Sequence, residues 1–512
     1  MPSVTPPFRL SVPTDGVRAD LAPQDVPPTA LRDSQNWIYR DGIFRGRAGF
    51  TAFGNDVNER PMAFADYVHN DGARRLVMGT RVGWRKYNTG AGTWDSITGT
   101  LTGAAGDQIV FRVFDRGGTK YLLGINGADT LKKWDGAAAG FSAAGGSPPR
   151  ARTMVIANDR IVLFNLLSGP TISGSAYDVS ASKDFDAGWG VTLSGILVDT
   201  PGSIVAALEF GPLQSAIYKE DAIYMMFAQA PTIAPFRFEL KSAAVAGPVS
   251  PLAAVQVSDG LHAFLGLDGA VRLFDGVETR SIGYHAQKYI ASRLDPALAG
   301  RSFGFFDREQ NDLVFAFPEF GSTEPNVFVH LNVGSGSFWP QRFPATIRAS
   351  AGLKVTATTS VTLGDLPGNI GDYDKTLGEF DAPLRNVIFG ETGGQVYTNS
   401  GVTDAGAGIE TYFETGLLGE GPEWKTLIEI EHLLKPQGAA ASASLQIGVA
   451  VSNEDRVLGS AVAIPHGAIA PPFHTGHRVS ARRFSYRLST ASSPTTPEWA
   501  GAVAHFAGRG PR

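Results

Sequence analysis

Two histidines near the carboxyl end of the sequence have the spacing of metal ligands. His474 and His477 form a His-x-x-His motif between Phe473 and Arg478, and His466 lies nearby. Neutral imidazole is a common metal ligand, so two of them in one loop could hold an ion. A third ligand is not evident, and the neighbouring cation Arg478 would oppose a bound metal. We therefore interpret the pair as solvated loop histidines and predict no metal site.

Two pairs of carboxylates are each separated by a single residue. These pairs are Asp184 with Asp186, and Glu429 with Glu431. In a β-strand, residues two apart point to the same face, where two carboxylates could serve glycoside hydrolysis or bind calcium. The alternative is ordinary charge alternation on the exposed face of a strand, and this is our interpretation of both pairs.

Two basic clusters lie close to aromatic residues. Arg45-Gly46-Arg47 and Arg482-Arg483 could neutralise or stack on nucleic acid. The whole chain, however, has 44 Lys and Arg against 49 Asp and Glu, which gives a formal charge of −5. A protein of this charge is not expected to hold DNA phosphates tightly. We predict that these arginines form interface ion pairs or cover sheet edges.

The signatures of the common hydrolases and nucleotide-binding proteins are missing from the sequence. It contains no Gly-x-Ser-x-Gly elbow, no Gly-x-Gly-x-x-Gly turn and no Walker-type phosphate loop. The absence of cysteine excludes disulfides, thiolate metal ligands and a cysteine nucleophile. We predict a structural protein that is not an enzyme and acts by assembly, with no catalytic residues, no cofactor and no metal.

The composition predicts a large all-β protein. The 512 residues exceed the size of one hydrophobic core, and they include 61 Gly, 32 Pro and 31 Phe, which favour turns and strands. The amino terminus lacks the pattern of a signal peptide, and no run of about 18 apolar residues occurs. We therefore expect synthesis in the cytoplasm and no membrane span.

A recurring pattern between about residues 60 and 400 predicts β-hairpins. A short apolar run leads to an aromatic residue and a glycine-containing turn, and a second aromatic residue usually follows. Clear copies occupy 82–94, 131–141, 270–276 and 327–339, and 395–401 is a weaker copy. Four-stranded blades of about 40–50 residues would make this region a β-propeller of roughly six to eight blades. Unrelated hairpins in β-sandwiches are the alternative.

Changes in sequence character divide the chain into three parts. Residues 1–35 carry seven prolines and predict an extended arm. Residues 36–405 predict the β-propeller-like domain with insertions, and within it 283–294 predicts one short helix ended by Pro296. Residues 406–512 predict a carboxyl-terminal antiparallel β-sheet domain, because apolar and polar residues alternate cleanly there. The alternating apolar positions are Leu445, Ile447, Val449 and Val451, and Phe484, Tyr486 and Leu488.

The segment 36–50 reads NWIYRDGIFRGRAGF, that is, Asn, a short strand, Gly and then Arg-x-Gly-Phe. With the polar stretch 25–36 before it, this segment resembles the nozzle-type tail proteins of short-tailed bacteriophages, also described as tail tubular protein B or packaged-DNA stabilisation protein. That family often has Pro where this chain has Ala48. Three further stretches are similar and occur in the same order along the chain. They are 268–276 with 281–283, 311–317 with 338–339, and 482–487.

The resemblance implies a propeller-containing subunit of the virion tail. It implies a homohexameric ring below the portal and the adaptor, which together form the head-to-tail connector, and contacts with other tail proteins. The ring would form part of the conduit for genome ejection and would touch DNA transiently. A mildly acidic wall suits such passage, since each neutralised phosphate strengthens DNA binding. In a ring, the proline-rich arm would lie across the neighbouring subunit.

Three other classes of function remain open from the sequence. A receptor-binding tail fibre or adhesin would stack exposed Trp84, Trp94 or Trp339 on glycan rings. A glycan-active propeller enzyme would use paired carboxylates such as Asp184 and Asp186. A non-viral β-propeller scaffold that binds peptides would have no need of a separate sheet domain after residue 405.

Overall fold

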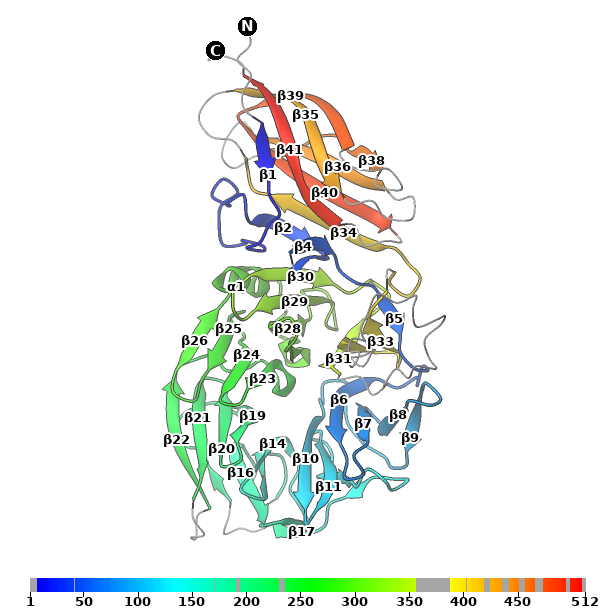
Figure 1. The fold of residues 1–512 in the computed structure, drawn as a ribbon. Helices are drawn as coiled ribbons and strands as arrows, with labels where there is room; N and C mark the ends of the chain where they lie inside the picture. Colours follow the sequence, from blue (N-terminus) through cyan, green and yellow to red (C-terminus); the bar gives the residue numbers. More distant parts are fainter. Residues whose placement is uncertain are drawn as a thin grey trace.

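The computed structural model of the chain is built almost entirely from antiparallel β-sheets, as the sequence predicts. Within the described residues, seven sheets form a ring and two further sheets form a β-sandwich beside it (Figure 1). No helix in the described part of the chain is long and apolar enough to cross a membrane. The described residues are 7–40, 42–169, 171–189, 194–229, 235–355, 387–401, 403–418, 424–434, 442–450, 456–465, 473–493 and 498–508.

Seven sheets follow one another along the chain, and we number them blades 1 to 7. Blades 1 to 3 consist of Pro61–Val68 (β6), Arg74–Thr80 (β7), Trp84–Asn88 (β8) and Thr93–Ile97 (β9); Val110–Arg116 (β10), Thr119–Ile125 (β11), Lys132–Trp134 (β12) and Ser142–Ala143 (β13); and Ala151–Ala157 (β14), Arg160–Leu166 (β15), Ser173–Ala181 (β16), Asp184–Trp189 (β17) and Gly195–Ile196 (β18). Blades 4 and 5 consist of Ile204–Gly211 (β19), Gln214–Lys219 (β20), Ala222–Ala228 (β21) and Phe236–Ala243 (β22); and Ala254–Ser258 (β23), Leu261–Leu265 (β24), Val271–Phe274 (β25) and Thr279–Ile282 (β26). Blades 6 and 7 consist of Phe303–Asp307 (β27), Asp312–Phe317 (β28), Val327–Asn332 (β29) and Phe338–Arg342 (β30); and Ala349–Lys354 (β31), Val387–Glu391 (β32), Val396–Asn399 (β33) and Phe50–Ala52 (β5).

The ring of blades is closed, which makes this part of the chain a β-propeller. The first strands of successive blades contact one another in the order β6, β10, β14, β19, β23, β27 and β31, and β31 returns to β6. Strand β5 precedes blade 1 in sequence but completes blade 7, where Thr51 pairs with Thr398 on β33. Hydrogen bonds between distant segments therefore close a ring that no disulfide could close. Seven blades fall within the predicted range.

The recurring sequence pattern marks the outer hairpin of a blade. Its four clear copies form the hairpins β8–β9, β12–β13, β25–β26 and β29–β30. In two of these hairpins the turn contains Asp-Gly, and its second residue must be glycine. Gly136 and Gly276 have positive φ values of 81° and 90°, which other residues rarely adopt. The weaker copy contains β33, whose outer partner β5 comes from far away in the sequence.

One short α-helix follows blade 5, where the sequence predicts it. Helix α1 (Tyr284–Ala291) begins after Gly283 and buries Ala286 and Ile290, and Leu294 beyond its end is also buried. Two single turns of 3-10 helix, Pro251–Ala253 (η2) and Ala299–Arg301 (η3), precede the first strands of blades 5 and 6.

The β-sandwich is assembled from both ends of the chain. One sheet contains Trp37–Arg40 (β3), Ile43–Gly46 (β4), Glu498–Gly508 (β41), Lys425–Leu434 (β35) and Phe473–Ala481 (β39), with Phe8–Leu10 (β1) also paired to β41. The other contains Leu31–Gln35 (β2), Ile409–Thr415 (β34), Arg483–Ser493 (β40), Ser442–Ala450 (β36), Arg456–Leu458 (β37) and Val462–Pro465 (β38). The predicted alternation holds at Leu445, Ile447, Phe484, Tyr486 and Leu488, which are buried. It fails at Val449, which is half-buried while the neighbouring Ala450 is buried, and Val451 lies outside the described residues.

The predicted domain boundaries are wrong at the amino end. The described part of the predicted arm, residues 7–35, is not separate, because β1 pairs with β41 and β2 pairs with β34. Strands β3 and β4 also belong to the sandwich, so the propeller begins with β5 at Phe50 and not at residue 36. The physical reason is that the edges of the carboxyl-terminal sheets carry free N–H and C=O groups, which the extended segments satisfy. The boundary near 405 agrees with the end of β33 and the start of β34.

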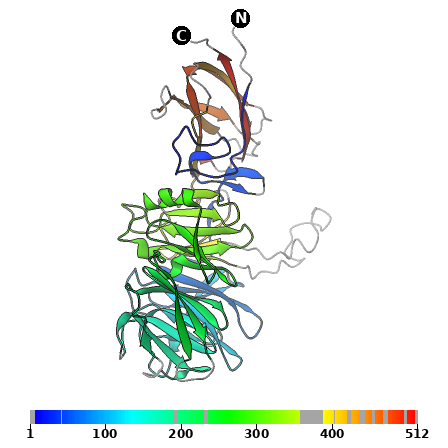
Figure 2. The same cartoon turned by 90° about the vertical axis from the view of Figure 1, so that its left-hand side faces the viewer.

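The sandwich lies beyond the rim of the propeller, next to β30 of blade 6 and to β5 (Figure 1). In the view turned by 90°, the sandwich and the propeller follow one another along the long dimension of the molecule (Figure 2). Strand β41 ends, at Gly508, at the end of the sandwich farthest from the propeller. The chain passes from the sandwich into the propeller between β2 and β5, so residues in this short segment can contact both domains.

Candidate functional site

Asn36 joins the sandwich to the propeller through one side chain. It lies between β2 and β3 with a positive φ of 63°, a conformation that Asn tolerates better than most residues. Its Nδ2 donates to the backbone oxygen of Glu410 in the sandwich at 2.7 Å. Its Oδ1 accepts from the backbone N–H of Arg342 in blade 6, also at 2.7 Å. A single buried amide thus bonds to both domains.

Arg47 forms a buried ion pair at the same place. Its Nη1 and Nη2 donate to the two carboxylate oxygens of Asp404 at 2.7 and 2.6 Å, and its Nε donates to Asn36 Oδ1 at 3.0 Å. Arg47 and Asp404 are only 2% and 4% exposed. Two parallel bonds to one carboxylate are the strongest geometry available to arginine. We call Asn36, Arg47 and Asp404 the junction clamp.

Gly49 and Phe50 explain the rest of the Arg-x-Gly-Phe motif. The N–H of Gly49 donates to the carbonyl of Gly401, and a Cβ at position 49 would lie 2.1 Å from the carbonyl oxygen of Thr403. Only glycine allows this approach of two backbones. The ring of Phe50 stacks on Phe343 with its centroid 5.4 Å away, and the Arg47 guanidinium lies 4.7 Å from the Phe50 centroid.

An aromatic cluster continues the contact between the domains. The ring of Phe44 lies 4.7 Å from Trp37 and 5.1 Å from Phe413 in the sandwich, and 5.7 Å from Trp339 in blade 6. All four side chains are buried. One hydrophobic core therefore runs from the sandwich into the propeller, which favours a fixed arrangement of the two domains.

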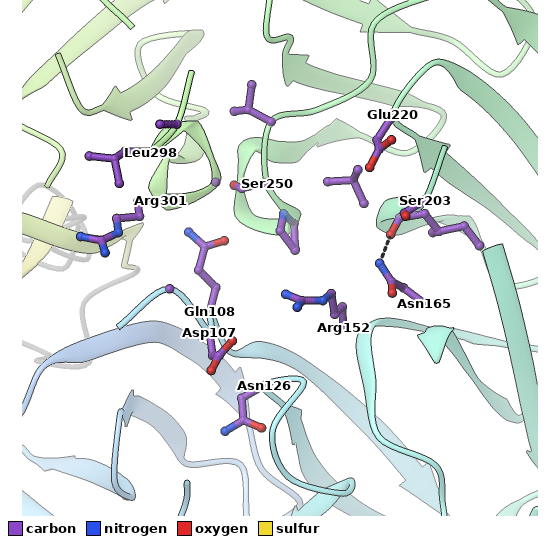
Figure 3. A pocket seen from close by; sticks show the side chains of 17 residues that line it. Asp107, Gln108, Asn126, Arg152, Asn165, Ser203, Glu220, Ser250, Leu298 and Arg301 are labelled. Atoms are coloured by element: carbon purple, nitrogen blue, oxygen red, sulfur yellow. Dashed lines mark hydrogen bonds between the residues drawn. The ribbon is translucent and has the colours of Figure 1, made fainter. Parts of the chain in front are cut away.

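A polar cavity of about 500 Å³ opens on the axis of the propeller (Figure 3). Its lining comes from several blades, and Gln108 and Arg152 point into it. Gln108 is 9% exposed, its Nε2 donates to the carbonyl of Ser302 at 3.1 Å, and its Oε1 is buried without a partner. Exposed Arg152 and Glu220 add one charge of each sign. The residues that line this cavity lie on separate blades, so no local sequence pattern indicates it.

The histidine pair His474 and His477 is divided between two environments on strand β39, and not in a loop. His474 Nδ1 lies 3.0 Å from Glu429 Oε1 at the surface, whereas His477 Nε2 lies 2.9 Å from Thr475 Oγ1. Thr475 in turn contacts the fully buried His432 at 2.8 Å, and burial lowers the pKa of His432 to about 3. No group of three His, Asp or Glu in the described part of the chain could hold a metal, and His466 lies outside it.

Asp184 and Asp186 are engaged in ion pairs between neighbouring blades. Arg116 of blade 2 binds Asp184 Oδ1 at 2.7 Å and Asp186 Oδ2 at 2.6 Å, and Lys133 of the same blade also binds Asp186. Burial acts to raise the pKa of Asp186, but the hydrogen bonds from Lys133 and Gly145 outweigh it and hold that pKa below its ordinary value. A glycosidase general acid needs the opposite shift. This pair connects blades 2 and 3.

The other charged candidates lie on strand surfaces. Glu429 and Glu431 are half-buried and alternate with the buried Ile430 and His432 on β35, which agrees with charge alternation on one strand face. His432 was not predicted as a polar core residue, although its place between Ile430 and Leu434 in that alternation is the signal that marks it as inward-facing.

The two arginines of each basic cluster differ in their exposure to solvent. Arg45 is exposed while Arg47 is buried in the junction clamp, and Arg482 is exposed while Arg483 is half-buried. Each pair therefore presents at most one well-exposed cation to solvent.

The three tryptophans considered for glycan stacking are all buried. Trp84, Trp94 and Trp339 are 1%, 2% and 2% exposed, respectively. Trp84 stacks on Phe141 with a centroid distance of 4.5 Å, and Trp94 Nε1 donates to the carbonyl of Phe53. These side chains stabilise the blades and are not available to a sugar ring.

Among the comparisons with known proteins, only the search of solved structures finds similar chains. No family model matches the chain, and no curated protein matches it. The extracellular domain of a protein described as a hybrid two-component system from B. thetaiotaomicron is similar over 69% of this chain, with 10% identity and a TM-score of 0.38, and the chain spans 40% of that domain's length. Sqt1 from Saccharomyces cerevisiae is similar over 69% of this chain and 98% of its own length, with 12% identity and a TM-score of 0.37.

Proposed function

We propose that this protein is a structural subunit of a bacteriophage tail, part of a nozzle or hub ring below the portal and the adaptor. One observation supports the proposal most directly. The stretches that resemble the nozzle-type family, although separated by up to about 440 residues, all contribute to one hydrophobic core. Their members in this core include Trp37 and Phe44, Leu273, Phe315, Trp339 and Tyr486.

The position of this core is consistent with the role that the resemblance implies. It runs through the junction of sandwich and propeller, where the clamp also lies. A ring subunit must present two contact surfaces at a fixed angle, since small rotations accumulate around a closed ring. A rigid junction is the property that such a subunit needs.

The proposed partners follow from this role. Identical subunits would form a homohexameric ring in the virion tail, contact the connector and other tail proteins, and allow DNA to pass with transient contact. The formal charge of −5 suits a conduit wall, because few phosphates would be neutralised. The role is non-enzymatic, and it agrees with the engagement of Asp184 and Asp186 in ion pairs.

The test is the oligomeric state of the full chain, measured by native mass spectrometry and cryo-electron microscopy class averages. The chain is measured alone and mixed with the portal–adaptor complex of its own virus, because a tail subunit can require its adaptor for assembly. A sixfold ring with an open axial channel is expected in the mixture. A monomer in both samples would overturn the proposal, and a trimer would indicate a fibre or adhesin.

The axial cavity favours a second candidate, a propeller scaffold that binds a peptide. The unpaired Gln108 Oε1 would accept from a peptide N–H, and Arg152 would pair with a carboxylate. The expected evidence is a monomer that binds an acidic peptide with an affinity that falls at least tenfold in both Gln108→Leu and Arg152→Ala. Absence of binding to an acidic peptide library would remove this candidate.

A further inference from the structure

A second polar cavity lies at the junction of the two domains. It has a volume of about 310 Å³ and is bounded by the hairpin β3–β4 of the sandwich, by β29 and β30 of blade 6, and by β33 of blade 7. Arg40, Arg45 and Arg47 all line it, together with His330. No carboxylate is among the described residues of the lining. The cavity is therefore surrounded by cationic and polar groups from both domains.

Four polar atoms of this lining are buried without a hydrogen-bond partner. They are Arg40 Nε, His330 Nε2, Gln341 Oε1 and Asn399 Oδ1. His330 and Gln341 are only 4% and 2% exposed. Each unpaired buried group costs about 1–3 kcal/mol, and native proteins leave few such groups. Four of them around one cavity indicate that a polar species belongs inside it.

Each of the four side chains can present a hydrogen-bond donor to the cavity. His330 Nδ1 accepts from Arg40 Nη2 at 3.0 Å, so the proton of the neutral ring is on Nε2, the unpaired nitrogen. The neutral ring is the relevant form, because burial lowers the pKa of His330. The amides of Gln341 and Asn399 present NH₂ in place of oxygen after a half-turn about their last bond. Arg45, which is exposed, adds a guanidinium at the mouth.

The charges around the cavity also favour an anion. Arg40 is paired with Asp312 at 2.9 Å and Arg47 with Asp404, but neither carboxylate lines the cavity. Glu498 pairs in register with Arg45 across β4 and β41, and it too is outside the lining. A compact anion with several acceptor oxygens would satisfy the unpaired donors Arg40 Nε and His330 Nε2, whereas a cation would meet no carboxylate among the described residues of the lining.

We propose that this cavity binds a phosphate-type oxyanion, either inorganic phosphate or the phosphate group of a small ester, between the sandwich and the propeller. The volume is near the lower end of small-molecule sites, about 300–1,000 Å³, and leaves room for an ester group or for water beside a phosphate. Bound anion would bridge the two domains close to the junction clamp. The site is independent of the role in a phage tail.

The test measures binding to the full chain by isothermal titration calorimetry and thermal unfolding. Inorganic phosphate and glycerol phosphate are each titrated at constant ionic strength, with sodium chloride as the balancing salt. Saturable binding and a rise in melting temperature with either phosphate compound are expected. Tighter binding of glycerol phosphate would identify an ester as the ligand, and equal binding would identify free phosphate.

Variants of the lining separate a specific site from general salt effects. Arg45→Ala and Asn399→Leu should weaken phosphate binding at least tenfold, while Arg81→Ala, which removes an exposed arginine that does not line the cavity, should leave it unchanged. Arg45→Gln provides a second test if the alanine variant folds poorly. The proposal is overturned if chloride and phosphate raise the melting temperature equally, or if the folded lining variants bind phosphate as the wild type does.

Discussion

Truncating Arg47 to alanine should lower the free energy of unfolding by about 3–5 kcal/mol, the usual cost of removing one partner of a buried ion pair. Four hydrogen bonds would be lost, two to Asp404, one to Asn36 Oδ1 and one to the carbonyl of Ala48. The largest part of the cost comes from Asp404, which is 4% exposed and would become a buried carboxylate without a counter-ion. The Phe50 ring would also lose the guanidinium above it.

Scanning calorimetry is the suitable assay, because two domains need not unfold in one step. The variants Arg47→Met, Asp404→Leu and the double mutant form a cycle that isolates the pair. We expect the double mutant to be less destabilised than the sum of the single mutants by about 1–3 kcal/mol, since it leaves no unpaired charge in the core. Lys183→Ala is the matched control, because Lys183 and Asp159 form an ion pair with side chains 74% and 61% exposed. The control should unfold as the wild type does.

The reasoning would be refuted by either of two results. A loss of less than about 1 kcal/mol in Arg47→Ala would mean that Asp404 finds water or another partner at low cost. Strict additivity in the cycle would mean that the two charges are not energetically coupled. In both cases the junction clamp would not hold the sandwich on the propeller, and the argument for a rigid ring subunit would lose its basis.

Three further substitutions test other parts of the structure. Gly49→Ala places a methyl group 2.1 Å from a backbone oxygen, so its melting temperature should fall clearly, whereas Gly106→Ala, where nothing lies within 4 Å, should have little effect. Burial lowers the pKa of His262 to about 4, so between about pH 6.5 and 4 the unfolded chain binds a proton that the folded chain does not. The free energy of unfolding therefore falls as pH falls through this window. In His262→Gln, calorimetry should show a melting temperature that depends less on pH over the same range. Burial raises the pKa of Asp178 to about 6, so the folded state loses stability as pH rises through 4 to 6, and Asp178→Asn should be more stable than wild type at pH 8 but not at pH 3.5 in urea denaturation. If Asp178→Asn and the wild type had the same free energy of unfolding at both pH values, the result would contradict the burial of that carboxylate.

The parts of the fold that were predictable from the sequence depend on local chemistry. Asp135-Gly136 and Asp275-Gly276 mark outer hairpins because the turn needs a positive φ, and that requirement is visible in the dipeptide itself. Helix α1 was predictable for a similar reason, from the spacing of Ala286 and Ile290. Closure of the ring by β5 was not predictable, since a three-residue strand carries no sign of a partner about 350 residues away.

The candidate sites also combine features that local sequence predicts with contacts to distant segments that it does not. Arg45 and Arg47 look alike in the sequence, but β4 ends at Gly46, so the chain turns and buries only the second guanidinium. Asp184 and Asp186 share a face as predicted, yet the cations that neutralise them come from the preceding blade. Pairing across blades depends on the angle between sheets, which no local pattern encodes.

The sharing of the sandwich between both ends of the chain has a consequence for synthesis on the ribosome. Arg45 on β4 pairs with Glu498 on β41, 453 positions later, so at about 5–20 residues per second the amino-terminal strands spend roughly 20–90 s without their partners. The propeller, whose last blade needs only β5 and residues up to Asn399, can close during this interval. The seven prolines among residues 1–35 lie on either side of β1 and before β2, and because proline cannot donate to a sheet they would limit how far the unpaired segment can join strands of other nascent chains.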